Sequence, residues 1–259
     1  MKSDPNGVSG IGGGKEVRVS VCLASYRGSR YIKEQLDSIL AQLGPDDEVV
    51  IVDDASPDDT VAQIRTFEDS RIRLLEAKIN KGYVKSFEQA ILACNGGFIL
   101  LADQDDVWMP GRLELMVSAL RSADVVASNF DVLGDGPRPN IPRLRSKDSR
   151  RHAANLFGVL VGYRAYYGCC MGFRRQVLPV FAPVPGYLNE SHDLWLAICG
   201  NLGRSIQHLD ESTLLRRIHD ENATPRSWRS LSVIVRSRIM LARCMILATR
   251  RLLLQRRTD

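Results

Sequence analysis

The feature that most constrains the fold is a regular alternation of short apolar runs with stretches of helical periodicity. The run Val17–Ala24 predicts a strand, and apolar residues at helical spacing follow it from Ile32 to Leu43. The next run, Val49–Val52, is apolar on both faces, as a strand covered by helices on both sides should be. Repeated strand–helix units of this kind predict an α/β fold with a mostly parallel sheet flanked by helices.

The alternation continues along the chain. A helix is expected to start at Ser56, with Pro57 at its first position and a carboxylate three residues after the capping serine. Further strands are predicted at Ile72–Leu75, Phe98–Ala102 and Val125–Ser128, and further helices at Val84–Ala93, Gly111–Leu120 and about His192–Gly203. Extended segments are expected through Ile206–His219, followed by a terminal helix from about Trp228 to Arg257.

Five parts of the chain are distinguished by composition. The first is a Gly/Ser-rich leader without apolar periodicity, and one internal stretch holds three prolines, two glycines and six Lys/Arg, which favours a loop. The predicted parts are a flexible leader 1–16, a part with strand–helix alternation 17–133, a basic loop 134–151, a second part 152–225 and a basic amphipathic C-terminal helix 226–259.

Charge and cysteine usage narrow the class of protein. Residues 216–259 carry 11 Lys+Arg against 3 Asp+Glu, whereas residues 1–215 carry 24 against 27, so the basic character belongs to the tail. Nucleic-acid binding by the main body is therefore not expected. The six cysteines form no C-x-x-C pair and no signal peptide is recognisable, which together predict reduced thiols and a cytoplasmic location.

Polar residues follow three of the predicted strands, where parallel sheets bind their ligands. They are Ser25-Tyr26, Asp53-Asp54 and Asp103-Gln104-Asp105-Asp106. Three crowded carboxylates at one strand end are unfavourable unless a cation neutralises them, and Mg²⁺ or Mn²⁺ takes oxygen ligands of this kind. The alternative is a solvated acidic turn that caps the next helix.

Two of these residues suit a pyrimidine base. A carboxylate at Asp54 could accept from an imide N–H, and the ring of Tyr26 could lie against the base. Taken singly, each residue has a simpler explanation, because Asp54 could cap a helix and Tyr26 could pack in the core.

Five sequence blocks resemble glycosyltransferase family 2 in order and spacing over roughly residues 17–220. They are Ala24–Gly28, Glu34–Ile39, Val52–Thr60, Asn80–Gly82 and Asp103–Trp108. The resemblance implies the nucleotide-binding glycosyltransferase A fold, with residues 17–133 as the nucleotide-sugar-binding half and residues 152–225 as the acceptor-binding half. Gln104, Trp108 and the later segment His192–Ala197 resemble the bacterial rhamnosyltransferase-like branch most closely.

The resemblance also implies roles for individual residues. Ser25, Tyr26, Asp54 and Asp103 would contact the nucleotide; Asp103, Asp105 and His219 would hold the metal; Asp193 would be the catalytic base; and Gly168, Cys169, Cys170, His192 and Trp195 would line the acceptor side. Each role has a structural alternative. Asp193 could simply stabilise the first turn of a helix, the cysteines could be buried, and His219 could be structural.

The terminal helix carries a pattern of its own. Arginine recurs every seven residues at 229, 236, 243, 250 and 257, which places these side chains in one stripe beside a broad apolar surface. No uncharged stretch approaches the ~20 residues that span a bilayer. The helix could lie at the inner face of the cytoplasmic membrane as a peripheral contact, or it could pack on the main domain with a solvated basic edge.

These observations predict a metal-dependent, inverting glycosyltransferase of bacterial surface polysaccharide synthesis. The resemblance implies a dTDP-rhamnose or UDP-sugar donor and a saccharide or lipid-linked acceptor. A sugar-nucleotide nucleotidyltransferase is an alternative, but it would need a Gly-rich basic loop where Ala24–Arg30 offers one Gly and two Arg. A non-catalytic partner that docks through the basic helix is the other alternative.

Overall fold

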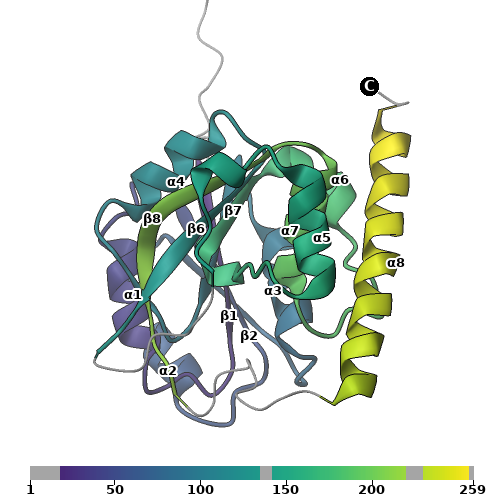
Figure 1. The fold of residues 1–259 in the computed structure, drawn as a ribbon. Coiled ribbons are helices and arrows are strands. Elements are labelled where there is room, and N and C mark those ends of the chain that lie inside the picture. The colour runs from purple at the N-terminus through teal and green to yellow at the C-terminus, as the bar shows by residue number, and fades with distance from the viewer. Residues whose placement is uncertain (1–17, 135–141, 220–229, 257–259) are drawn as a thin grey trace, which may run out of the picture.

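The protein forms one open mixed sheet with helices on both faces (Figure 1). The computed structural model describes residues 18–134, 142–219 and 230–256. Within these, eight strands pair in the order β3-β2-β1-β4-β7-β6-β8-β5. The strands are β1 (Val19–Ser25), β2 (Glu48–Asp53), β3 (Ile72–Glu76), β4 (Phe98–Asp103), β5 (Val107–Trp108), β6 (Val125–Val132), β7 (Met171–Arg174) and β8 (Ile206–Arg216).

The helices connect these strands and cover both faces of the sheet. The α-helices are α1 (Ile32–Leu40), α2 (Thr60–Arg65), α3 (Tyr83–Ala93), α4 (Arg112–Leu120), α5 (His152–Val161), α6 (Leu178–Phe181), α7 (His192–Leu202) and α8 (Leu231–Gln255). Three short 3₁₀ helices are η1 (Ser146–Asp148), η2 (Gly168–Cys170) and η3 (Arg175–Val177).

Alternate side chains of the central strands supply two cores, one on each face of the sheet. On β2, Val50 and Val52 join the cluster with α3, α5, α6, α7 and α8, whereas Val49 and Ile51 join the cluster with α1, α2 and α4. All six residues of β2 are buried. The strand is therefore apolar on both faces because helices cover both faces, as its sequence predicts.

The sheet changes direction at β7. Strands β1 to β4 are mutually parallel, as predicted, but β7 runs antiparallel to both of its neighbours, β4 and β6. Gly172 lies where β7 crosses close to β4, since a Cβ there would come within 2.4 Å of a Leu100 methyl. Beyond β6 the sheet continues with β8, which is parallel to β6.

Helix α8 packs along the second half of the domain, against α5, α6 and α7 (Figure 1). Leu241, Cys244 and Ala248 form its buried stripe. Arg251 donates from its guanidinium to the carbonyls of Val180 and Pro183, which ties the C-terminal half of the helix to the region around α6. No helix among the described residues is long and apolar enough to cross a membrane.

One helix start differs from the prediction. Helix α2 begins at Thr60, not at Ser56. The Ser56 hydroxyl donates to the Asp53 carboxylate at 2.6 Å, and the Ser56 backbone N–H donates to the same carboxylate at 2.8 Å. Because Ser56 serves as a partner of Asp53, it does not cap the helix.

Several predictions fall outside the described residues. These are the leader 1–16, the centre of the basic loop at 135–141, the segment 220–225, and the start of the terminal helix at Trp228, together with Arg229 and Arg257. The described parts of the basic loop are held in place, because Asn129 exchanges hydrogen bonds with the backbone of Leu144.

Candidate active site

The three polar strand ends meet at one edge of the sheet. In the parallel register, Ser25 of β1 pairs with Asp53 of β2, and Ala24 pairs with Asp103 of β4. The residues that follow these strands therefore project from the same carboxyl edge, where open α/β sheets bind ligands. The structure brings Tyr26, Asp54 and the acidic run after β4 together, as the strand-end argument expects.

Ser25 turns inward at this edge. Its hydroxyl donates to the Asp53 carboxylate at 2.8 Å, and both side chains are buried. Asp53 also binds Ser56, so the three side chains form a closed polar cluster. Ser25 thus supports the strand end, and only its backbone and the residue after it face the nucleotide side.

Asp54 is the most firmly held of the predicted nucleotide ligands. Its two carboxylate oxygens accept from the backbone N–H groups of Lys81 and Gly82, each at 2.8 Å. Gly82 has φ 87°, a left-handed conformation that glycine adopts without strain. Each carboxylate oxygen has a second lone pair, so a fixed Asp54 can still accept from an imide N–H.

A side chain that the sequence analysis did not assign to the site joins the loops after β1 and β4. Gln104 accepts from the Tyr26 N–H at 2.8 Å and donates to the Tyr26 carbonyl at 2.9 Å. Gly28 permits this pairing, since a Cβ there would lie 2.3 Å from the Gln104 amide oxygen. The pairing leaves the Tyr26 ring 38% exposed, with the Arg27 guanidinium 5.3 Å from its centroid.

The acidic corner, defined as Asp103, Asp105 and Asp106, crowds its charges as predicted. Burial, together with the charge of Asp105, raises the pKa of Asp103 to about 6. Burial and both neighbouring carboxylates raise the pKa of Asp106 to about 8. The ionised form of these carboxylates is unfavourable, and a cation beside them would stabilise it.

The corner's donor atoms fit a divalent cation. Oxygens of Asp103 and Asp106 and the Cys169 sulfur lie within 4.8 Å of one another. One Asp106 oxygen is buried without a hydrogen-bond partner among the described residues. His219 Nε2 lies 2.7 Å from Asp105 Oδ2, so these two predicted ligands are in contact. Carboxylate oxygens are ligands of the kind that Mn²⁺ and Mg²⁺ prefer.

Two arginines at the end of β8 enclose this corner. Arg217 donates its backbone N–H to Asp106 at 3.2 Å and its side chain to the Asp105 carbonyl and to Glu34. The pKa of Arg216 is raised by its anionic neighbours, among them Asp103 and Asp106. The sequence analysis did not propose Arg216, which lies inside the predicted extended segment Ile206–His219 and is not marked by any local pattern.

Asp193, the candidate base, lies in the first turn of α7. Its pKa is raised to about 7, mainly by burial and also by the negative charge of Asp103, while Arg216 opposes the rise. Tyr83 of α3 accepts from the Ser191 N–H just before α7, and its pKa is raised by burial together with the charges of Asp193 and Asp103. Asp193 and the acidic corner are therefore close enough for their charges to act on each other.

Of the five residues predicted on the acceptor side, Trp195 is placed wrongly. It is fully buried and donates its indole N–H to the Phe181 carbonyl at 2.9 Å. It therefore packs in the core of α7 and contacts no acceptor.

The other four form a buried layer behind the site surface. The His192 ring stacks on Phe87 with centroids 4.4 Å apart, and burial lowers its pKa to about 4. Gly168 allows this position, since a Cβ there would lie 2.7 Å from His192 Nε2. Cys169 and Cys170 are each 1% exposed, and the Cys169 sulfur faces the acidic corner, so neither lines an acceptor surface.

Comparison with known proteins identifies the family. The model of glycosyl transferase family 2 matches residues 20–181, which is more than half of the chain. The chain belongs to glycosyltransferase family 2. The fold is accordingly the glycosyltransferase A fold that the sequence blocks imply. The match begins in β1 and ends with α6, so it includes the acidic corner and stops before Asp193.

Two curated relatives align with 80% and 45% of this chain at 28% and 29% identity. An uncharacterised glycosyltransferase from Nostoc is 28% identical over 218 residues, which cover 80% of this chain and 66% of the relative. The Escherichia coli protein WfgD, named as a UDP-Glc:α-D-GlcNAc-diphosphoundecaprenol β-1,3-glucosyltransferase, is 29% identical over 45% of this chain and 47% of its own. The chain thus spans about half to two thirds of the length of these relatives.

Solved structures share the fold. Staphylococcus aureus TarS in complex with UDP-GlcNAc superposes with a TM-score of 0.66 and 19% identity, covering 86% of this chain and 66% of TarS. Glucosyl-3-phosphoglycerate synthase from Mycobacterium tuberculosis, in complex with Mn²⁺, UDP and phosphoglyceric acid, gives 0.59 and 19% identity over 88% of this chain and 78% of its own.

Proposed function

We propose that this protein is a metal-dependent, inverting glycosyltransferase that moves a sugar from a nucleoside-diphosphate sugar to a hydroxyl of a saccharide or lipid-linked saccharide acceptor. The observation that carries the proposal is the joint placement of the acidic corner and Asp193 in one site. Family membership supports the reaction class. The E. coli relative named for a diphosphoundecaprenol-linked acceptor and a relative named for succinoglycan biosynthesis support a role in bacterial surface polysaccharide synthesis.

The donor nucleotide is assigned to the edge formed by β1, β2 and β4. Tyr26 offers an exposed ring for the base, Asp54 accepts from the imide, and Asp103 contacts the ribose or the metal. Uracil and thymine present the same imide edge, so UDP- and dTDP-linked donors both fit, and rhamnose is one candidate sugar. Fold neighbours that bind UDP-GlcNAc and UDP support this nucleotide class.

A divalent cation, Mn²⁺ or Mg²⁺, is assigned to the acidic corner. Asp103 and Asp105 would hold it with His219, and Asp106 lies next to them. When bound, the cation neutralises charge that develops on the departing nucleoside diphosphate. Arg216 adds a fixed positive charge beside the same corner.

Asp193 is assigned as the base that takes the proton from the acceptor hydroxyl. A pKa of about 7 suits this role, because the carboxylate is available near neutral pH yet retains affinity for a proton. A cation at the acidic corner would lower this pKa, since it offsets the charge of Asp103. We therefore expect the rate of transfer to rise with pH through a pKa at or below about 7 and then to level off.

The Asp193→Asn variant tests this assignment. It should reduce kcat by about 10²–10⁴-fold, the usual range for loss of a general base, and leave UDP affinity within about twofold of the wild type. The matched control is Glu190→Gln, three residues away, which should retain transfer within about tenfold. Transfer that persists in Asp193→Asn, or that disappears only in Glu190→Gln, contradicts the assignment of the base.

We also propose that α8 makes a peripheral contact with the inner face of the cytoplasmic membrane. The exposed side of the helix carries a stripe of Arg236, Arg243 and Arg250. A second stripe beside it consists of Ile239, Ile246 and Leu253, each between 54% and 57% exposed. The described helix holds no acidic residue, so pairing with a second copy would bring arginines together, whereas anionic headgroups would neutralise them.

A further inference from the structure

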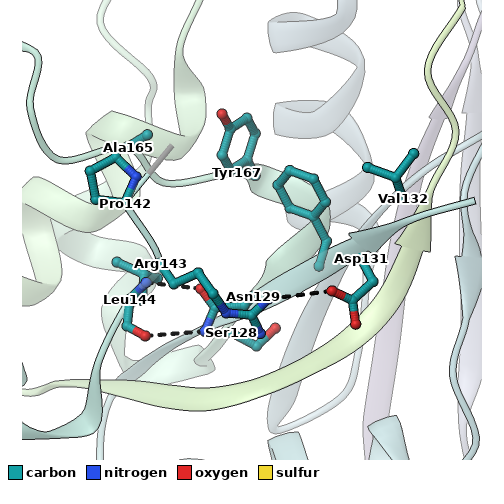
Figure 2. A pocket seen from close by; sticks show the side chains of 10 residues that line it. Ser128, Asn129, Asp131, Val132, Pro142, Arg143, Leu144, Ala165 and Tyr167 are labelled. Carbon is teal, nitrogen blue, oxygen red and sulfur yellow. Dashed lines mark hydrogen bonds and ion pairs between the residues drawn. The ribbon is translucent and has the colours of Figure 1, made fainter. Parts of the chain in front are cut away.

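The second half holds a cavity of about 210 Å³ that the proposed reaction leaves unused (Figure 2). It is smaller than the ~300–1,000 Å³ pockets that hold drug-sized ligands, so it suits a single ring. Its lining comes from β6, the described end of the basic loop, and the approach to η2: Ser128–Val132, Pro142–Leu144, Ala165 and Tyr167.

One wall of this cavity is aromatic. The rings of Phe130 and Tyr167 meet edge to face with centroids 5.1 Å apart. The Arg216 guanidinium lies over both rings, 5.4 Å and 4.7 Å from their centroids. Aromatic faces of this kind offer an apolar surface to the C–H groups of a sugar ring.

Other parts of the lining are polar, and their side chains pair with one another. Arg143 donates to the Asp131 carboxylate at 3.3 Å (Figure 2). It also donates to the Ser212 hydroxyl at 2.8 Å. Asn129 holds the neighbouring backbone of Leu144 in both directions. A carboxylate and a guanidinium held side by side present an acceptor and donors together, the combination that binds vicinal hydroxyls.

The cavity adjoins the reacting groups. The charge of Asp193 contributes to the raised pKa of Tyr167, and the charges of Asp103 and Asp106 act on Arg216, which covers the aromatic wall. β6 is separated from β4 by β7, so the cavity lies on the far side of the acidic corner from the nucleotide edge. A ligand here would approach Asp193 from the side opposite the donor base.

We infer that this cavity binds one neutral sugar ring of the acceptor, the unit that carries or adjoins the attacking hydroxyl. The inference rests on the proposed glycosyltransferase function and deepens it. A phosphate is the poorer occupant because the Asp131 carboxylate would repel it. The aromatic wall of Phe130 and Tyr167 then sets the ring plane, and Asp131 with Arg143 selects the hydroxyl pattern.

The direct test is binding of sugars in the absence of any donor. Saturation-transfer NMR on the full chain would use a set of methyl glycosides of neutral sugars as probes, with UDP affinity measured separately as a control for folding. At least one glycoside should bind the wild type. Its affinity should fall about tenfold in Asp131→Asn, the effect of weakening hydrogen bonds to a charged group. Asp210→Asn, whose side chain faces Arg145 and Ser146, should bind like the wild type.

A second variant addresses the cavity without removing a polar group. Ala165→Leu should fill the space and abolish glycoside binding. The inference is overturned if no methyl glycoside binds the wild type, or if Asp131→Asn and Ala165→Leu both bind the probe as the wild type does. Because this readout needs no transfer, glycoside binding that depends on Asp131 would support the cavity even if sugar transfer from a nucleotide donor failed.

Discussion

The two halves of the sheet hold their polar residues in different ways. Along β1 to β4, the strands are parallel and their end residues are locked by short hydrogen bonds, such as those from Lys81 and Gly82 to Asp54. Around β6 to β8, the sheet changes direction at the antiparallel strand β7. The polar side chains of Asp131 and Arg143 line a cavity there. Under the proposed function, the rigid first half would hold the donor nucleotide, and the second half would offer a separate surface to the acceptor.

The contrast extends to the outer surface. The charges of the acidic corner lie at the carboxyl edge of the sheet, partly or fully buried, whereas the arginines of the α8 stripe are exposed. Buried carboxylates resist ionisation unless a cation is present, while exposed arginines remain charged and available. The two regions should therefore respond differently to substitution.

The largest effect is expected at the α8 stripe. Replacing Arg236, Arg243 and Arg250 together by Gln should weaken binding to vesicles rich in phosphatidylglycerol by about 100-fold, since each basic residue contributes about 1 kcal/mol near an anionic surface. Sedimentation with such vesicles measures this. Replacing Arg121, Arg150 and Arg204, which are exposed elsewhere, removes the same charge and should have little effect; equal losses would mean that α8 is not the contact.

A change within the acidic corner should stabilise the fold. Asp106→Asn removes a charge that is unfavourable in the folded state, so the free energy of unfolding without metal should increase by about 2 kcal/mol at pH 8. Because the folded pKa of about 8 lies above the ordinary value of 3.8, this gain should vanish as the pH falls toward 4. Urea denaturation at both pH values measures it.

The control for this change is another buried carboxylate with the opposite surroundings. Asp47 accepts from the backbone N–H groups of Val19 and Gly44 and pairs with Arg18. Asp47→Asn should therefore lower the stability at pH 8. A loss of stability in Asp106→Asn at pH 8 would show that its charge is already neutralised in the folded protein.

A smaller effect should separate Ser25, which ends β1, from Tyr26, which follows it. Tyr26→Ala should weaken UDP binding by about tenfold, because it removes the ring on which the base is proposed to stack. Ser25→Ala should change UDP affinity by less than about twofold but reduce stability by about 1 kcal/mol, since its hydroxyl serves Asp53. Calorimetric titration with UDP and urea denaturation distinguish these outcomes, and a larger loss of UDP binding in Ser25→Ala would contradict the placement.

The sequence predicts the first half well because its signals are local. Buried runs such as Val49–Val52 mark parallel strands, and the residues after such strands share an edge whatever the details of packing. The predicted start of α2 at Ser56 was wrong because of a tertiary contact. The Ser56 hydroxyl donates to Asp53, so it does not cap the helix.

The second half was harder to predict because burial there depends on distant elements. His192 has polar neighbours and Trp195 stands between Leu194 and Leu196, and the packing of Phe87 and Phe181 against them shows that both side chains are interior. Arg216 acts at the site because β8 lies beside β6, a pairing that no local pattern encodes. The cavity next to Asp131 arises from the same long-range arrangement.

The central claim is that the acidic corner holds a cation which in turn holds the diphosphate of the donor. Titration of UDP with and without Mn²⁺ tests it most directly, in the wild type, in Asp105→Asn and in the exposed control Asp59→Asn. Mn²⁺ should raise the UDP affinity of the wild type and the control by about tenfold and leave that of Asp105→Asn unchanged. Equal UDP affinity with Mn²⁺ and with a chelator in the wild type would contradict the account.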